Sequence, residues 1–265
     1  MEVCKELKDL AKEFKNAGYK LYIVGGWVRD ELLGLPSEDI DITSNMPSEK
    51  VLKISNKLKL KANTINKELG TIQIIFNSKI FEYTRFRHES YLHDGTHTPE
   101  KIQFVDKIET DCLRRDFTIN SLYYDIVDNR ILDFVKGQKD LESRIIKTTQ
   151  DPEITFADDG LRILRAIRFA STLDFHIEKS TLKALRIYTP YLKSISKERI
   201  LKELKSLAIA DHIHGKKNTQ FLTLMNKLDL PKYLFNSTLS RSKKFTKRDI
   251  ANFYNISKDA RLIGL

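Results

Sequence analysis

The sequence predicts an α+β fold, with strands and helices mixed over residues 1–148 and an all-helical region after them. Short apolar runs rich in β-branched residues, at 19–24, 70–76 and 79–84, are typical of buried strands and lie among amphipathic helical patterns. From Pro152 onward, apolar residues recur at helical spacing instead. With 265 residues, the chain is long enough for one large domain or two smaller ones.

The composition is that of an ordinary globular protein, with 31% charged and 41% hydrophobic residues. No apolar run is as long as a membrane-spanning helix, and charged residues begin at Glu2. Both observations argue for a soluble, cytoplasmic protein without a signal peptide. The two cysteines, Cys4 and Cys112, are far apart and match no metal-binding spacing. We therefore expect two free thiols in a reducing compartment.

Positive charge is concentrated towards the C-terminus. The net charge is +10, and residues 197–265 hold 15 Lys and Arg against 6 Asp and Glu, so the remainder is nearly neutral. A basic region beside a nearly neutral remainder predicts a polyanionic partner, although lysines that only maintain solubility are an alternative. The last basic stretch includes Arg241, Lys243, Lys244, Lys247 and Arg248.

A strand, a pair of glycines and a helix start follow one another near the N-terminus. The predicted strand 19–24 leads into Gly25-Gly26, and residues 27–33 are expected to form a short helix. Glycines let a backbone approach a phosphate closely, and the free N–H groups at a helix start favour negative charge. Arg29 adds a charged donor. The stretch predicts an anion site, with an ordinary tight turn as the alternative.

Two carboxylates follow at the start of the next predicted strand. Asp39 and Asp41 alternate with Ile40 and Ile42, so a strand places both carboxylates on one face. Such carboxylates repel each other, and Mg²⁺ takes oxygen ligands of this kind while binding phosphates. We predict Asp39 and Asp41 as catalytic metal ligands, with a plain polar strand face as the alternative. Glu82 is either a third carboxylate or an ordinary surface residue.

The region from 85 to 101 is polar, has no clear period, and is predicted to form a long loop. Its histidines, His88, His93 and His97, lack an ordered scaffold and are expected to be exposed rather than metal ligands. The other predicted elements around it are helices at 2–17 and 48–60, and strands at 70–76 and 79–84 joined by a turn at Asn77-Ser78.

A third polar motif is Arg114-Arg115-Asp116-Phe-Thr-Ile-Asn120. Two arginines beside a carboxylate and an amide can hold a triphosphate and a ribose, because arginine offers several donors to phosphate oxygens. Asp116 can accept a hydrogen bond from a ribose hydroxyl, which favours ribonucleotides. The alternative is a structural arginine–aspartate pair at a helix start. A hairpin is predicted over 123–134.

A long helix is predicted over 153–171, because its apolar residues recur at helical spacing. Asp159, Arg162 and Arg165 lie three apart and would form one polar stripe on it. An ordinary salt bridge between positions three apart is the alternative. Further helices are predicted at 180–193, 196–210 and 217–235.

These motifs resemble those of the class II CCA-adding tRNA nucleotidyltransferase and bacterial poly(A) polymerase family, which has a polymerase-β-like head. The resemblance implies a mixed-sheet catalytic head at 1–148, a helical neck with the base-recognition helix at 149–210, and a short basic body, with a reduced tail, at 211–265. It rests on the motifs at 25–30, 39–41, 114–120, 156–169 and 196–204.

The resemblance also implies how the base is chosen. Asp159 and Arg162 match the family's Glu-Asp-x-x-Arg motif, with Asp158 in place of Glu. A carboxylate with a guanidinium pairs with C and A and mismatches U and G, and each unpaired buried group costs about 1–3 kcal/mol. The implied nucleotide-binding residues are Gly25, Gly26, Arg29, Arg115, Asp116, Asn120, Asp159, Arg162, Arg165 and Arg168.

Residues 85–101 resemble the family's flexible loop, which helps CCA-adding members switch to the final A and is shortened in CC-adding relatives. The loop here is near full length, which favours the complete activity. His97-Thr98 stands where many members have two arginines.

The implied reaction is the template-independent addition of C, C and A to the 3′ end of tRNA from CTP and ATP. Asp39 and Asp41 would hold two Mg²⁺ ions, and pyrophosphate would leave. No membrane or protein partner is expected. CC-adding, A-adding and poly(A)-adding enzymes of the family are alternatives. A non-catalytic RNA- or nucleotide-binding protein is another, against which the intact Asp39 and Asp41 argue.

Overall fold

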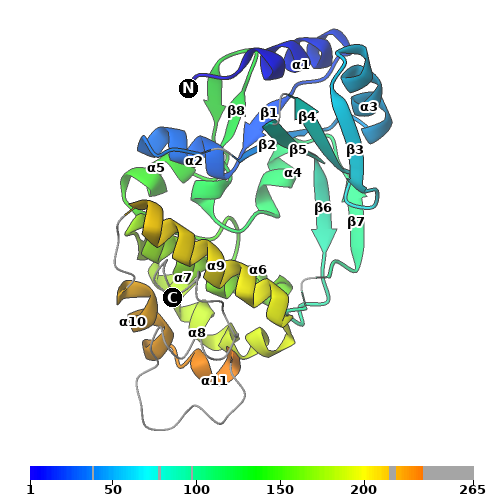
Figure 1. The fold of residues 1–265 in the computed structure, drawn as a ribbon. Coiled ribbons are helices and arrows are strands. Elements are labelled where there is room, and N and C mark those ends of the chain that lie inside the picture. Colours follow the sequence, from blue (N-terminus) through cyan, green and yellow to red (C-terminus); the bar gives the residue numbers. More distant parts are fainter. Residues whose placement is uncertain (38, 77–78, 97, 215–218, 235–265) are drawn as a thin grey trace. The chain divides into compact units, whose positions relative to one another are not determined.

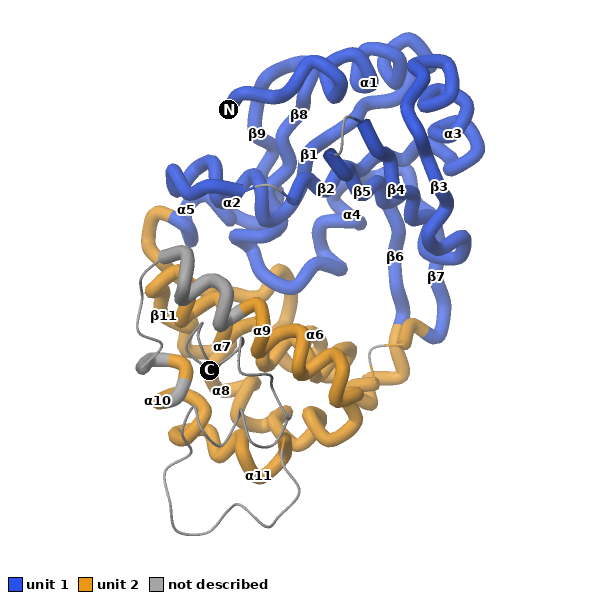
Figure 2. Tube along the Cα trace, viewed as in Figure 1, with its two compact units in different colours: residues 1–90, 100–141 blue, residues 91–99, 142–265 orange. Residues whose placement is uncertain are grey.

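The computed structural model describes residues 1–37, 39–76, 79–96, 98–214 and 219–234. The chain forms two compact units, shown in blue and orange in Figure 2. Unit 1 contains residues 1–90 and 100–141, and unit 2 contains residues 91–99 and the chain from Glu142 onward. No helix among these described residues is long and apolar enough to cross a membrane.

Unit 1 is built on a seven-stranded mixed sheet with the order β3-β4-β5-β2-β1-β8-β9. Its only parallel pair is β2 with β5, as far as the described residues show. The mixed sheet confirms the predicted α+β class. The strands are β1 (Tyr22–Val24), β2 (Ile40–Ser44), β3 (Lys61–Asn66), β4 (Thr71–Phe76), β5 (Lys79–Arg85), β8 (Tyr123–Asp125) and β9 (Arg130–Leu132).

Two helices, α1 (Lys5–Asn16) and α3 (Ser48–Lys57), lie side by side at the top of Figure 1. Leu7, Leu10 and Phe14 are buried in one core cluster with sheet residues, and the rings of Phe14 and Tyr83 lie 6.1 Å apart. Each buried leucine contributes about 1.5–3 kcal/mol through apolar area removed from water. The predicted helix at 2–17 is therefore confirmed as the cover of this core.

The remaining short helices of unit 1 surround the carboxyl end of β1 and the turn before β8. They are α2 (Gly26–Leu33), α4 (Ile108–Leu113), the 3₁₀ helix η1 (Thr118–Asn120) and α5 (Gly137–Glu142), whose last residue belongs to unit 2. The predicted hairpin at 123–134 is present as β8 and β9.

The prediction of one long loop over 85–101 is wrong at both ends, where the chain forms strands instead. Residues Arg87–Ser90 (β6) and Lys101–Phe104 (β7) pair as an antiparallel ribbon. Each strand has four residues, too few to give a clear alternating pattern. The tip, residues 91–99, belongs to unit 2. The predicted turn at Asn77-Ser78, and His97, lie outside the described residues.

Unit 2 is mainly helical, with one short parallel pair between β10 (Ile145–Ile146) and β11 (His176–Ile177). Its helices are α6 (Pro152–Asp158), α7 (Leu161–Leu173), α8 (Lys179–Tyr188), η2 (Thr189–Ser194), α9 (Lys197–His214), α10 (Thr219–Lys227) and α11 (Pro231–Leu234). The basic stretch with Arg241, Lys243, Lys244, Lys247 and Arg248 lies outside the described residues.

The single helix predicted over 153–171 is wrong, because it breaks between α6 and α7. Asp159 has an extended backbone with φ −145° and ψ 104°, so it cannot continue α6. Gly160 follows and precedes the first residue of α7. Asp159 is therefore at a junction between two helices and not on a helical stripe with Arg162 and Arg165.

Candidate functional site

The predicted strand, glycine pair and helix are present as β1, Gly25 and α2. Gly25 has φ 84° and ψ −133°, a conformation that favours glycine. A Cβ atom built on Gly25 would lie 3.9 Å from Oδ2 of Asp41 and 3.8 Å from the carbonyl oxygen of Asn120. The turn therefore brings the backbone at the start of α2 next to one predicted metal ligand, where free N–H groups favour an anion.

Arg29 is a buried link between two motifs that are far apart in the sequence. Its side chain donates two hydrogen bonds to the carboxylate of Asp30, at 2.8 and 2.9 Å. Its Nη1 donates to Oδ1 of Asn120 at 2.6 Å, and Nδ2 of Asn120 lies 3.3 Å from Oδ1 of Asp116. The structure thus brings together the predicted residues Arg29, Asn120 and Asp116. Asp30, adjacent to Arg29 in the sequence, was missed as its partner.

The predicted catalytic carboxylates lie at the start of β2. Asp41 is exposed within the strand and Asp39 is exposed just before it. The register pairs Asp41 with Val24 on one side and with Glu82 on the parallel strand β5 on the other. Paired residues of neighbouring strands project to the same face, so Glu82 lies beside Asp41.

The donor set fits a magnesium ion that also binds a nucleotide. Across the described ranges, no three His, Cys, Asp or Glu side chains are grouped to hold a metal without other ligands. Mg²⁺ is commonly bound by one or two carboxylates together with substrate phosphates and water. Asp41, whose Oδ2 lies near the Gly25 turn, offers hard oxygen donors that match that ion, and Asp39 lies two residues before it.

Asp111 is a buried hub that sequence reasoning missed. It accepts hydrogen bonds from Nε of Arg114 at 2.8 Å, Nη2 of Arg115 at 3.1 Å and the hydroxyl of Tyr123 at 2.8 Å. The backbone N–H of Arg87 donates to it at 3.2 Å. Burial alone would raise the pKa of Asp111, but the two arginines and Tyr123 hold that pKa well below its usual value.

Arg115, a predicted nucleotide-binding residue, is held by this hub. Its guanidinium lies 5.2 Å from the ring centroid of Tyr123, and its Nε donates to the Tyr123 hydroxyl at 3.0 Å. Burial alone would lower the pKa of Arg115, but Tyr123 and Asp111 raise it. Arg115 pairs with Asp111, a partner that the sequence analysis did not consider. The spacing of four residues was the available signal.

In unit 2, Asp159 is fixed at the start of α7. Its Oδ1 accepts the N–H of Leu161 at 2.9 Å, and its Oδ2 lies 3.4 Å from Nη2 of Arg199. Arg162 is 7% exposed, and its Nη1 donates to the carbonyl oxygen of Thr155 at 3.3 Å. The helix break therefore gives Asp159 two anchors that a position inside a helix would not offer.

Arg165 and Arg168 are both held by Glu203 of α9. The two arginines lie 3.5 and 2.7 Å from the Glu203 carboxylate. Their guanidinium carbons lie 5.4 and 4.1 Å from the centroid of the Phe169 ring. Glu203 is only 8% exposed, so this is a buried anchor for two predicted site residues.

The tip of the β6–β7 ribbon packs against the α6–α7 break. The N–H of Gly95 donates to Ala157 at 2.7 Å, and the N–H of Gly160 donates to Gly95 at 3.2 Å. Thr96 forms an isolated antiparallel bridge with Asp159. The tip and the junction at Asp159 therefore share backbone hydrogen bonds.

Two side chains complete this contact. Nδ1 of His93 lies 2.7 Å from the Asp158 carboxylate, and the Tyr191 hydroxyl donates to the carbonyl oxygen of His93 at 3.3 Å. Gly95 has φ 75°, and a Cβ atom there would lie 2.5 Å from Cδ2 of Tyr191. His88 and His93 are exposed as expected. Cys4 and Cys112 are free thiols, as predicted.

Comparison with known proteins gives consistent matches. Residues 21–147 match the poly A polymerase head domain, and residues 174–240 match the probable RNA and SrmB-binding site of polymerase A. A CCA-adding enzyme of Staphylococcus epidermidis is 35% identical over 212 residues, which are 80% of this chain and 52% of that protein. The chain spans about half the length of the curated relatives it matches.

Solved structures agree. The Bacillus stearothermophilus CCA-adding enzyme in complex with CTP matches with a TM-score of 0.75 and 32% identity, over 88% of this chain and 54% of that chain. A tRNA nucleotidyltransferase complexed with a primer tRNA and an incoming ATP analog matches with a TM-score of 0.70 and 26% identity, over 88% of this chain and 64% of that chain.

Proposed function

Because the chain belongs to the family of class II CCA-adding tRNA nucleotidyltransferases and bacterial poly(A) polymerases, we propose that it adds C, C and A to the 3′ end of tRNA from CTP and ATP. One observation carries the proposal. The carboxylate of Asp41 lies beside the Gly25 turn, at the start of the helix that carries Arg29. The proposed site for an incoming triphosphate would thus adjoin the carboxylate of Asp41 on the central strand β2.

The triphosphate would be bound by the backbone at Gly25 and Gly26 and by Arg29. Arg29 keeps its orientation because Asp30 and Asn120 hold its guanidinium from two sides. Asp116 is hydrogen-bonded to Asn120, which also binds Arg29. It would accept a hydrogen bond from a ribose hydroxyl. Arg115 would contribute positive charge to the phosphates from its position on Asp111.

The reaction joins the terminal 3′-oxygen of the RNA to the α-phosphorus and breaks the bond to the β-phosphate, which releases pyrophosphate. Asp39 and Asp41 would hold the magnesium ions and, when bound, these would neutralise the charge on the phosphates and lower the pKa of the 3′-hydroxyl. The residues themselves orient the reactants. Glu82, paired with Asp41 across β5 and β2, is available as an additional carboxylate.

Asp159 and Arg162 would choose the base. The carboxylate of one and the guanidinium of the other offer an acceptor and a donor, the complement of cytosine and adenine. The Leu161 N–H and Arg199 orient Asp159, and Thr155 orients Arg162. Arg165 and Arg168, held by Glu203, would add donors along the same helix.

The RNA partner would be tRNA, consistent with the basic composition of residues 197–265 and with the RNA-binding region matched at 174–240. Lysine and arginine bind polyanions mainly through phosphate contacts, which weaken as salt rises. We propose that the protein is soluble and acts in the cytoplasm.

The test uses the full chain with tRNA transcripts that lack CCA, end in C, or end in CC, each with CTP, ATP or both. Addition of C, C and A to the first transcript, followed by a stop, supports the proposal. A stop after CC, addition of A alone, or unlimited A tails would each replace it with the corresponding activity of the same family. No incorporation, with RNA binding retained, would leave a binding protein.

A further inference from the structure

A nearly buried carboxylate of the β6–β7 ribbon has no role in the reaction as proposed above. Glu89 lies in β6, two residues before the tip, and its side chain is 6% exposed. Its Oε1 accepts a hydrogen bond from Nε of Arg87 at 2.6 Å and lies 3.7 Å from Nη1 of Arg114. The side chains of both arginines are also largely buried, so the three charges are close together and mostly withdrawn from water.

The two arginines connect Glu89 to the Asp111 hub. Oδ1 of Asp111 accepts hydrogen bonds from Nε of Arg114 at 2.8 Å and from the backbone N–H of Arg87 at 3.2 Å. The other oxygen of Asp111, Oδ2, lies 3.1 Å from Nη2 of Arg115. A continuous series of charged contacts therefore runs from Glu89 through Arg114 and Asp111 to Arg115.

The electrostatics of this cluster show what Glu89 contributes. Burial and the neighbouring charge of Arg114 lower the pKa of Arg87, and the charge of Glu89 opposes that shift. Glu89 is thus a counter-charge that allows the two guanidinium groups to lie near each other. Without it, Arg114 would be attracted more strongly to Asp111 and would compete with Arg115 for that carboxylate.

We propose that Glu89 is a positioning residue for the incoming nucleotide, which acts through Arg114 and Asp111 to hold Arg115 in place. The inference rests on the proposed function, in which Arg115 contributes positive charge to the phosphates. Because the triphosphate is common to CTP and ATP, Glu89 should affect the binding of both. It should leave the choice of base unchanged, since the residues proposed for that choice belong to unit 2.

The test removes the charge of Glu89 and keeps its shape. In Glu89→Gln, the amide oxygen can still accept a hydrogen bond from Arg87, but Arg114 loses this ionic partner. The dissociation constant of CTP in the absence of RNA should rise about fivefold. KM for CTP with a transcript lacking CCA, and KM for ATP with a transcript ending in CC, should rise by the same factor. KM for each transcript, and the ratio of kcat/KM for CTP and UTP, should stay unchanged.

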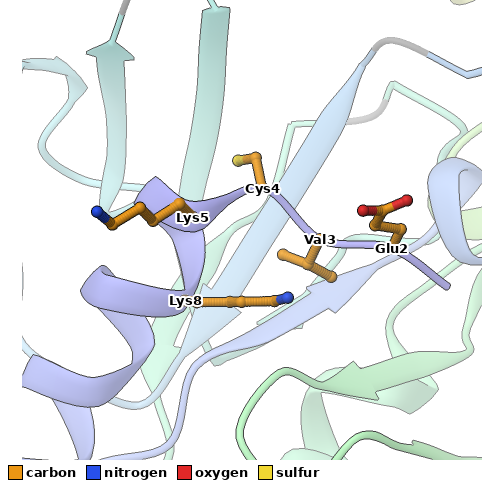
Figure 3. A pocket seen from close by; sticks show the side chains of 5 residues that line it. All are labelled: Glu2, Val3, Cys4, Lys5 and Lys8. Atoms are coloured by element: carbon orange, nitrogen blue, oxygen red, sulfur yellow. The ribbon is translucent and has the colours of Figure 1, made fainter.

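Two other glutamates are matched controls, because the same substitution removes a charge from an exposed position of unit 1. Glu109 is exposed on α4, two residues before Asp111. Glu2 is exposed and lines a hollow of about 600 Å³ whose walls also include Lys5 and Lys8 (Figure 3). Both Glu109→Gln and Glu2→Gln should leave the dissociation constant of CTP unchanged. This result would exclude a general effect of net charge.

A cycle of single and double variants separates positioning from a purely structural role. Arg115→Lys should itself weaken CTP binding, because lysine lacks the planar fork that Asp111 holds. If Glu89 acts through Arg115, then adding Glu89→Gln to Arg115→Lys should weaken CTP binding little further. If Glu89→Gln fails to fold, Arg114→Lys takes its place in the cycle, because a lysine cannot pair with both carboxylates as the guanidinium does.

Three results would overturn the inference. The first is that the effects of the two substitutions on CTP binding multiply, and the second is that Arg115→Lys binds CTP as the wild type does. The third is that Glu89→Gln lowers the free energy of unfolding while CTP binding stays intact. Absence of incorporation by the wild type would instead overturn the proposed function, and the dissociation constants of CTP would still test the role of Glu89.

Discussion

Oδ2 of Asp111 lies 3.1 Å from Nη2 of Arg115, and no part of the Asp111 side chain is exposed to solvent. The same carboxylate accepts a hydrogen bond from Arg114. One buried negative charge therefore holds two arginines of the motif at 114–120. The pairs are hydrogen-bonded on several sides, which is the condition under which a buried ion pair is maintained.

Asp111→Asn should destabilise the protein by about 3–5 kcal/mol, because the arginines lose the charge that compensates them. The measurement is the free energy of unfolding from urea titration. Asp9→Asn, an exposed position of α1, is the control and should change it by less than about 0.5 kcal/mol. Equal stability of the two variants would show that Asp111 contributes no net stabilisation.

Acid should reveal the same interaction. The pKa of Asp111 is lower in the folded protein than its usual value of 3.8, so the unfolded chain binds the proton first as pH falls. The contribution of the ionised Asp111 carboxylate to the free energy of unfolding is complete well above pH 3.8 and decreases progressively as the pH falls below it. Wild type should therefore lose more stability than Asp111→Asn between pH 5 and pH 3. Parallel pH profiles would contradict the lowered pKa.

Asp39→Asn and Asp41→Asn should each reduce kcat for CTP incorporation by at least about a hundredfold, because the amide lacks the negative charge and one of the two oxygens that would hold the metal. Both side chains are exposed, so unfolding midpoints and RNA binding should stay unchanged. Glu82→Gln, one strand away, measures whether the third carboxylate takes part. Retained incorporation in both aspartate variants would refute the metal assignment.

Gly95→Ala should loosen the tip of the β6–β7 ribbon, because the new methyl group collides with Tyr191. The expected loss of stability is about 1–3 kcal/mol. Gly18→Ala is a matched control with φ 82° and no atom within 4 Å, so it carries only the backbone strain. Addition of A to a transcript ending in CC should fall more in Gly95→Ala than addition of C does. If Gly95→Ala and Gly18→Ala changed the addition of A relative to C equally, the tip would have no role in the choice of A.

Asp159→Asn keeps an acceptor for the Leu161 N–H but replaces one carboxylate oxygen with a donor. Discrimination between CTP and UTP, measured as the ratio of kcat/KM, should fall by about tenfold, because the amide can pair with the uracil carbonyl. Asp151→Asn, which alters another helix-capping aspartate, should leave the ratio unchanged. An unaltered ratio in both would remove Asp159 from base selection.

The sequence predicted the parts of the molecule that depend on neighbouring residues. Strand, glycine and helix at 19–33 follow from local pattern, and so does the placement of Asp41 on a strand face. The break at Asp159 was missed because Phe156 and Leu164, eight residues apart, keep a helical spacing across it. Only Gly160 signalled an interruption.

Long-range partners were the other omission. Arg29 binds Asn120, 91 positions away, and Glu203 binds Arg168 from another helix. Sequence spacing predicts neither of these partners, because each pair forms only when two distant elements pack together in the fold. Asp111 was within reach of sequence reasoning, since it lies three and four residues before the two arginines. The side chain of Asp111 is completely buried, so its ion pairs with the two arginines are needed to compensate its charge.

The ribbon tip has a consequence for synthesis on the ribosome. Residues 91–99 emerge long before Ala157, Gly160 and Tyr191, which contact Gly95 or His93 in the finished chain. Strands β6 and β7, on either side of the tip, can pair as soon as both have been synthesised. The tip itself cannot form its contacts until the residues that it binds have been synthesised. The tip, which is part of unit 2, therefore stays incomplete until η2, which carries Tyr191, has been made. A chain stopped at residue 141 would retain the tip without any of these contacts.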